Sequence, residues 1–93
     1  MIVGIYLFQL RLFHSYSLKD KRAIRMSILS NLRRIYKVSA AEVDAQQMHN
    51  FLVIGASLVS SDALILRKTY DEILRYMDER CDVELINATM ELV

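Results

Sequence analysis

The sequence is 93 residues long, with 54% hydrophobic and 25% charged side chains, two glycines and no proline. No segment has the composition of a linker or a low-complexity region, which excludes two domains and predicts one domain over residues 1–93. The net charge of +1 excludes a general attraction to nucleic acid or to an acidic membrane.

Residues 2–13 predict one long strand, because they are rich in β-branched and aromatic side chains and carry no helix signal. Alternate residues of a strand point to opposite faces. One face is apolar throughout, and we expect it to meet the core; its residues are Ile2, Tyr6, Phe8, Leu10 and Leu12. The other face carries Val3, Ile5 and Leu7 before it becomes polar.

A first helix is predicted to begin at Leu18, because Ser17 and Asp20 have the spacing of a capping box. Its apolar residues fall within an arc of about 140° and form a core-facing stripe that runs to about Lys37. Two cations, Lys21 and Arg25, interrupt this arc near the start of the helix.

The segment 38–46 predicts a short strand of small residues, with Glu42 and Asp44 pointing the same way, and a turn at 46–50 follows. Phe51 to Val59 is a continuous apolar strand, so we expect both of its faces to be covered.

A second amphipathic helix is predicted to be capped by Ser60 or Ser61 and to end near Arg80. Residues 83–93 alternate and predict a last strand. One face of this strand carries Ile86, Ala88, Met90 and Leu92, and the other face carries Asn87, Thr89 and Glu91.

The element order is β-α-β-β-α-β, and each helix is apolar along one stripe. This pattern predicts an α+β ferredoxin-like sandwich, with a four-stranded antiparallel sheet and two helices on one face. The other face then exposes an apolar patch too large for water, so we predict a homodimer or higher oligomer that packs it. Cover by loops or C-terminal residues is the alternative. The predicted interface residues are Val3, Ile5, Leu7, Phe51, Val53, Val59, Val83 and Leu85.

Three segments in order, SLKDKR at 17–22, VSAAEV at 38–43 and IGASLVS at 54–60, resemble the small bacterial YlxP-like family. The resemblance covers nearly the whole chain. It implies a ferredoxin-like fold, and the family has no established activity. The neighbourhood of the family's genes implies a role around RNA or the ribosome. The chain departs from the family pattern at Lys37, at DAQQMH (44–49) and in a longer loop before Ser17.

Charge is distributed unevenly along the chain. Residues 1–46 hold eight basic and three acidic side chains (+5), whereas residues 47–93 hold four basic and eight acidic ones (−4). In the predicted topology the first helix begins beside the 46–50 turn and the 80–82 loop. Cations beside free helix amides bind anions, so we predict an anion or RNA site there. Its residues are Lys19, Lys21, Arg22 and Arg25. The alternative is that these cations are solvated or extend over the edge of the core.

Three further cations, Arg33, Arg34 and Lys37, continue the basic side of the first helix. They are placed to follow RNA phosphates, or else form a solvated face.

Catalytic and metal-binding motifs are missing from the sequence. Both glycines lie inside strands, so no phosphate-binding loop is expected, and His14, His49 and Cys81 lack ligand spacing. We therefore expect no catalytic residue, metal or cofactor, and an enzyme is the less favoured class. The single cysteine and a start that lacks a signal-peptide pattern favour a cytoplasmic protein away from membranes.

The leading hypothesis is a dimeric, non-enzymatic module whose basic first helix engages RNA or a ribosomal surface by backbone charge, without reading DNA sequence. The alternative is a regulatory domain that binds a small anionic ligand near Lys19 to Arg25 or in the dimer interface. A third possibility is an adaptor that binds another protein through the acidic second helix. The acidic residues concerned are Asp71, Glu72, Asp78 and Glu79.

Overall fold

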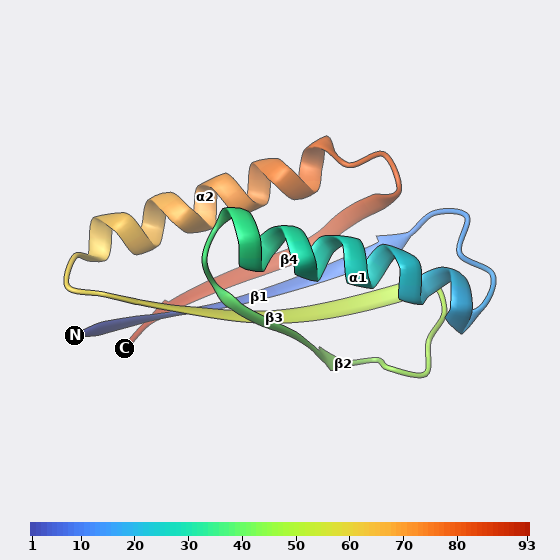
Figure 1. The fold of residues 1–93 in the computed structure, drawn as a ribbon, viewed down its shortest axis with the longest axis horizontal. Coiled ribbons are helices and arrows are strands. Elements are labelled where there is room, and N and C mark those ends of the chain that lie inside the picture. The colour runs from blue at the N-terminus through green and yellow to red at the C-terminus, as the bar shows by residue number, and fades with distance from the viewer.

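Two helices cover one face of a four-stranded sheet in the computed structural model, which describes residues 1–93 (Figure 1). The elements are β1 (Ile2–Leu12), α1 (Leu18–Ile35), β2 (Ser39–Asp44), β3 (Phe51–Ser60), α2 (Ala63–Glu79) and β4 (Val83–Leu92). The strands are ordered β2-β3-β1-β4, and all neighbouring pairs are antiparallel. The predicted ferredoxin-like α+β fold is confirmed. Neither helix is long and apolar enough to cross a membrane.

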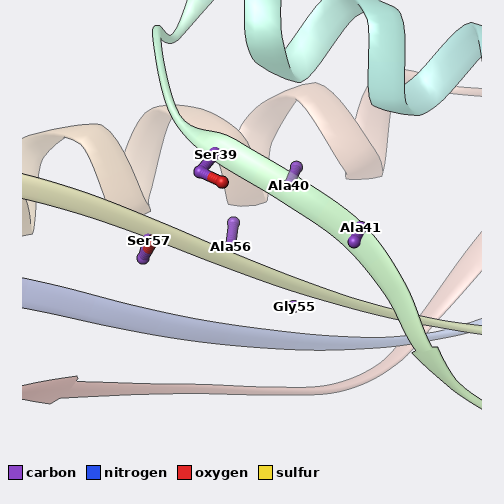
Figure 2. A pocket seen from close by; sticks show the side chains of 6 residues that line it. All are labelled: Ser39, Ala40, Ala41, Gly55, Ala56 and Ser57. Atoms are coloured by element: carbon purple, nitrogen blue, oxygen red, sulfur yellow. The ribbon is translucent and has the colours of Figure 1, made fainter.

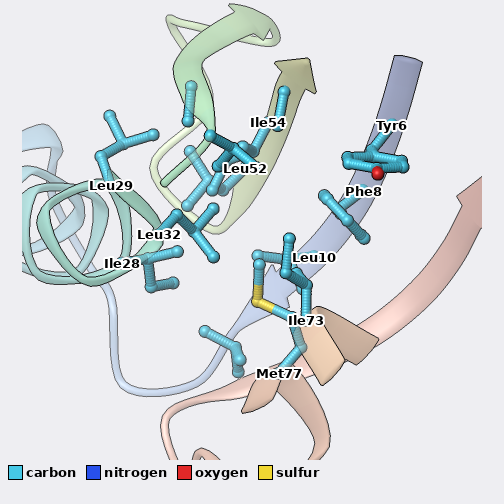
Figure 3. Close-up of a cluster of buried hydrophobic side chains, with 14 of the residues drawn as sticks. Tyr6, Phe8, Leu10, Ile28, Leu29, Leu32, Leu52, Ile54, Ile73 and Met77 are labelled. Carbon is cyan, nitrogen blue, oxygen red and sulfur yellow. The ribbon is translucent and has the colours of Figure 1, made fainter. Parts of the chain in front are cut away.

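The core lies between the sheet and the helices, where alternate residues of β1 meet one stripe from each helix. Tyr6, Phe8, Leu10 and Leu12 are all buried, which confirms the predicted inward face of β1. Figure 3 shows side chains of α1 and α2 converging on this row from the opposite layer. The helix residues buried there are Ile28, Leu29 and Leu32 of α1 with Ile73 and Met77 of α2.

Each helix begins at a side chain that accepts a hydrogen bond from a first-turn amide. Ser17 Oγ accepts from the Asp20 amide at 3.1 Å, and the Asp20 carboxylate accepts from the Tyr16 amide at 3.0 Å, so the predicted start of α1 is confirmed. The predicted cap of α2 is wrong. Asp62 is the capping residue, accepting from the Leu64 amide at 2.9 Å, while Ser60 still belongs to β3.

A β-bulge in β4 reverses the predicted faces of its first residues. Leu10 pairs with Leu85 and Gln9 pairs with Asn87, which leaves Ile86 without a partner in β1. Val83 and Leu85 therefore lie on the helix-covered face, with Val83 in the core. Their prediction as interface residues is wrong, because it assumed strict alternation through a position where an extra residue is inserted.

A second bulge lies in β2. Glu42 pairs with Ile54 and Asp44 pairs with Val53, so the intervening Val43 is the extra residue. Glu42 and Asp44 were predicted to point the same way, but the bulge places them on opposite faces of the sheet. Glu42 shares the helix-covered face with Ile54 and lies beneath α1.

Candidate functional site

A shallow basic pocket lies at the start of α1, where the first two turns of the helix approach the β2–β3 turn (Figure 1). Its volume is about 340 Å³, and its lining residues are Leu18, Lys19, Arg22, Arg25 and Gln46. Lys19 and Arg22 are exposed and three residues apart, so they share one side of the helix. The structure thus brings three of the four predicted cations together beside the 46–50 turn. No residue of the 80–82 loop lines the pocket.

Lys21, the fourth cation, points into the protein. Its side chain is 1% exposed, and Nζ donates to the Ala45 carbonyl at 2.8 Å. Nζ also lies 2.7 Å from Glu42 Oε2. That oxygen accepts no hydrogen bond of favourable angle, so the contact is an ion pair rather than a directed hydrogen bond. Lys21 is enclosed and paired, and we leave it out of the candidate site.

Glu42 also holds Arg25, the second cation on the apolar arc. Arg25 Nη1 donates to Glu42 Oε1 at 3.0 Å, and its side chain keeps 29% of its surface exposed. The two cations on the core side of α1 therefore share one buried carboxylate from β2. Arg25 retains donors toward the pocket, because only one of its guanidinium nitrogens is used in this pair.

Direct hydrogen bonds join the loop before α1 to the β2–β3 turn. The buried Ser15 hydroxyl donates to the His49 carbonyl, and His49 Nδ1 lies 2.8 Å from the Ser15 carbonyl. Ala45 has a φ of 56°, a conformation that is rare outside glycine, and its carbonyl is the one that Lys21 binds. These contacts fix Gln46 relative to the helix start and so define the pocket wall.

The charges at the start of α1 leave a surplus of two positive charges. Four cations (Lys19, Lys21, Arg22 and Arg25) face two carboxylates, Asp20 and Glu42. Glu42 forms ion pairs with the two inward cations, Lys21 and Arg25. The Asp20 carboxylate accepts a hydrogen bond from the Tyr16 amide. Glu42 balances only one of the two inward cations, and Asp20 balances one of the two outward ones, so each pair keeps one positive charge. The charge of the outward pair, Lys19 and Arg22, lies next to the positive end of the helix dipole. Such a pocket is suited to a phosphate or another oxyanion.

Residues 3–90 match a family model described as protein of unknown function (DUF503). The chain belongs to this family. The match begins in β1 and ends in β4, so it includes both the fold and the basic pocket. No curated protein matches the chain.

In this DUF503 domain the remaining cations of α1 lie at its far end. Arg33 Nη2 donates to the Ala40 carbonyl at 2.6 Å, and Arg34 Nη2 donates to the Asn31 side chain at 3.1 Å. Arg22 and Arg33 are eleven residues apart, or about 16 Å along the helix axis. The exposed residues between them are uncharged, including Met26 and Ser30. The predicted basic side is thus divided into two separate groups of cations.

The loop that was expected to complete the site is instead engaged in its own network. Arg80 donates to both carboxylate oxygens of Asp82, at 2.9 and 2.7 Å, and also to the Tyr76 hydroxyl and Ser27 Oγ. The hydrogen bonds from Arg80 hold the pKa of Asp82 below its usual value. This network attaches the end of α2 to the middle of α1.

Glu42 is the residue of the candidate site that sequence reasoning missed, whereas the turn that begins at Gln46 was predicted to lie beside the cations. For Glu42 a signal did exist, because two cations on an apolar arc require a buried anion from another element. The strand 38–46 offers only Glu42 and Asp44 as candidates. The choice between them depends on the bulge at Val43, which the sequence pattern does not reveal.

Proposed function

We propose that this DUF503 domain is a non-enzymatic module that binds structured RNA, such as ribosomal RNA, through phosphate groups at the start of α1. The observation that carries this proposal is the basic pocket, in which Lys19 and Arg22 are exposed and are not paired with Glu42, the carboxylate shared by Lys21 and Arg25. The YlxP-like identity and a cytoplasmic location belong to the same proposal.

The chemistry of the pocket favours phosphate. Arg22 offers a planar fork of donors and Lys19 a compact ammonium, and both groups bind phosphate oxygens well. Arg25 lines the same pocket and is oriented by Glu42, so less side-chain freedom is lost when an anion binds.

The second group of cations favours an extended ligand over a single ion. Arg33, Arg34 and Lys37 are exposed at the far end of α1, about 16 Å from the pocket along the helix axis. A nucleic-acid backbone carries phosphates over such a span. The open sheet face offers aliphatic side chains at its centre, Val3, Ile5 and Leu7, so stacking of bases on that face is not part of the proposal.

Binding to ribosomal particles and to a structured RNA is expected to weaken steeply with salt. Two or three phosphate contacts predict a loss of about 10- to 40-fold in affinity between about 50 and 200 mM salt, because bound counterions are released from the RNA. Fluorescence anisotropy with a labelled RNA, together with sedimentation of ribosomal particles, measures this loss. Absence of binding at both salt concentrations, or binding that is insensitive to salt, would count against the proposal.

A small anionic ligand is the second candidate, and the concave shape of the pocket favours it. A volume of about 340 Å³ is large enough for a phosphorylated metabolite. Thermal unfolding with a panel of nucleotides and organic phosphates separates the two candidates. A rise in melting temperature with one small compound would favour the regulatory domain, and a flat screen would weaken it.

A further inference from the structure

The strand registers arrange the residues of the open sheet face in rows. Val3 lies between Val59 of β3 and Val93, with which it exchanges two backbone hydrogen bonds. Ile5 pairs with Ser57, and Leu7 pairs with Gly55. Ile5 and Leu7 on β1 are therefore flanked by small residues on β3, whereas Val3 is flanked by another valine.

Val3, Ile5 and Leu7 form a ridge along β1. Ile5 is 43% exposed although it lies on a central strand of the sheet. Beside the ridge, Val59 is 57% and Val93 is 61% exposed. A contiguous apolar surface of this kind usually marks an interaction site.

A hollow of about 220 Å³ lies next to the ridge, and Figure 2 shows the residues that line it. Ala40 and Ala56 are buried and point toward the helices (Figure 2). The hollow therefore opens on the other face of the sheet, where the small residues of β2 and β3 lie. These are Ser39, Ala41, Gly55 and Ser57.

We propose that a second copy of this chain packs on the open face, so that the ridge of each copy fills the hollow of the other. A two-fold axis makes such a contact reciprocal, since any surface that carries a projection beside a matching depression can pair with itself. Ridge and hollow are direct neighbours on one face, because Ile5 pairs with Ser57 and Leu7 with Gly55.

The size of the face agrees with a dimer of moderate affinity. Four strands of 6 to 11 residues, about 4.8 Å apart and at about 3.3 Å per residue, cover roughly 600 Å². Two copies would bury about 1,200 Å², which is the lower end of stable specific interfaces.

Charged residues are confined to the margins of this face. Arg11 and Glu84 form an ion pair of 2.6 Å at one end, Glu91 lies on the edge strand β4 directly opposite Ile5, and Asp44 lies at the end of β2. An apolar centre with a polar rim is the usual composition of an interface. The helices lie on the opposite face, so both basic pockets stay exposed in the dimer. The dimer proposal therefore does not depend on the proposal of RNA binding.

Replacing Ile5 with glutamate is expected to raise the dimer dissociation constant at least 100-fold, because the contact would bury an unpaired charge. Sedimentation velocity over about 1 to 100 µM compares the variant with the unchanged chain. Ile5 is partly exposed in the single copy, but I5E sets a second carboxylate opposite Glu91, so circular dichroism must first show that the variant folds. Val59→Lys, at a still more exposed position, serves as a second variant should I5E unfold.

Leu64→Glu is the matched control, because Leu64 is 69% exposed at the start of α2 on the other side of the molecule. We expect this variant to dimerise like the unchanged chain. A monomer at 100 µM for the unchanged chain would overturn the proposal. So would an I5E or Val59→Lys variant that folds and still dimerises, because the contact would then lie elsewhere or involve a different protein.

Discussion

Replacing Glu42 with glutamine is expected to lower the free energy of unfolding by about 3 kcal/mol. Glu42 is the only carboxylate paired with Lys21, whose side chain is 1% exposed. Without it, the buried ammonium keeps only the Ala45 carbonyl and carries an uncompensated charge. Arg25 contributes less to the loss, since it is partly exposed and can turn to water.

Urea unfolding followed by circular dichroism measures this change, and the double variant Lys21→Met/Glu42→Leu provides the control. Apolar residues of similar size often replace a buried ion pair at little cost, so the double variant should recover most of the stability. A loss below about 1 kcal/mol for Glu42→Gln would show that water reaches the Lys21 ammonium. Equal instability of the single and double variants would show that the cost comes from packing rather than from charge.

The double variant Lys19→Ala/Arg22→Ala is expected to lose at least tenfold in affinity for structured RNA at about 50 mM salt. The slope of log affinity against log salt should become shallower by about two, one for each phosphate contact removed. Both residues are exposed, so stability should change by no more than about 0.5 kcal/mol.

Arg67→Ala/Lys68→Ala is the matched control, because it removes two exposed cations from α2 and changes the net charge equally. Its affinity should stay close to that of the unchanged chain. Equal losses in both double variants would show that binding follows net charge rather than the pocket.

Much of the fold could be predicted from periodicity. The alternation in β1 and the single apolar stripe on each helix follow from the geometry of strand and helix, and both were confirmed away from the ends of the elements, where Ile2, Leu18 and Ile35 are not buried. The prediction of strand faces failed where a strand contains one extra residue. The bulge at Ile86 moves Val83 into the core and Leu85 against its edge, and strand alternation cannot show where one residue is added.

The candidate site was predicted only in part. Helix geometry shows on which side of α1 a cation lies, but it does not show which residue of another element pairs with that cation. The positions of Lys21 and Arg25 on the apolar arc were apparent from the sequence. Their carboxylate lies in another element, and the bulge at Val43 decides that Glu42 rather than Asp44 faces them. The division of the cations into an inward pair and an outward pair therefore became apparent only with the tertiary structure.

Mapping of backbone amide chemical shifts during titration with a structured RNA hairpin tests the central claim most directly. We expect the largest changes at Leu18, Lys19, Arg22 and Gln46, and we expect them to disappear in the Lys19→Ala/Arg22→Ala variant. Smaller changes should follow at Arg34 and Lys37 if the RNA extends along α1. Changes concentrated on α2 or on the open sheet face, or no changes at all, would contradict the assignment of the pocket as the binding site.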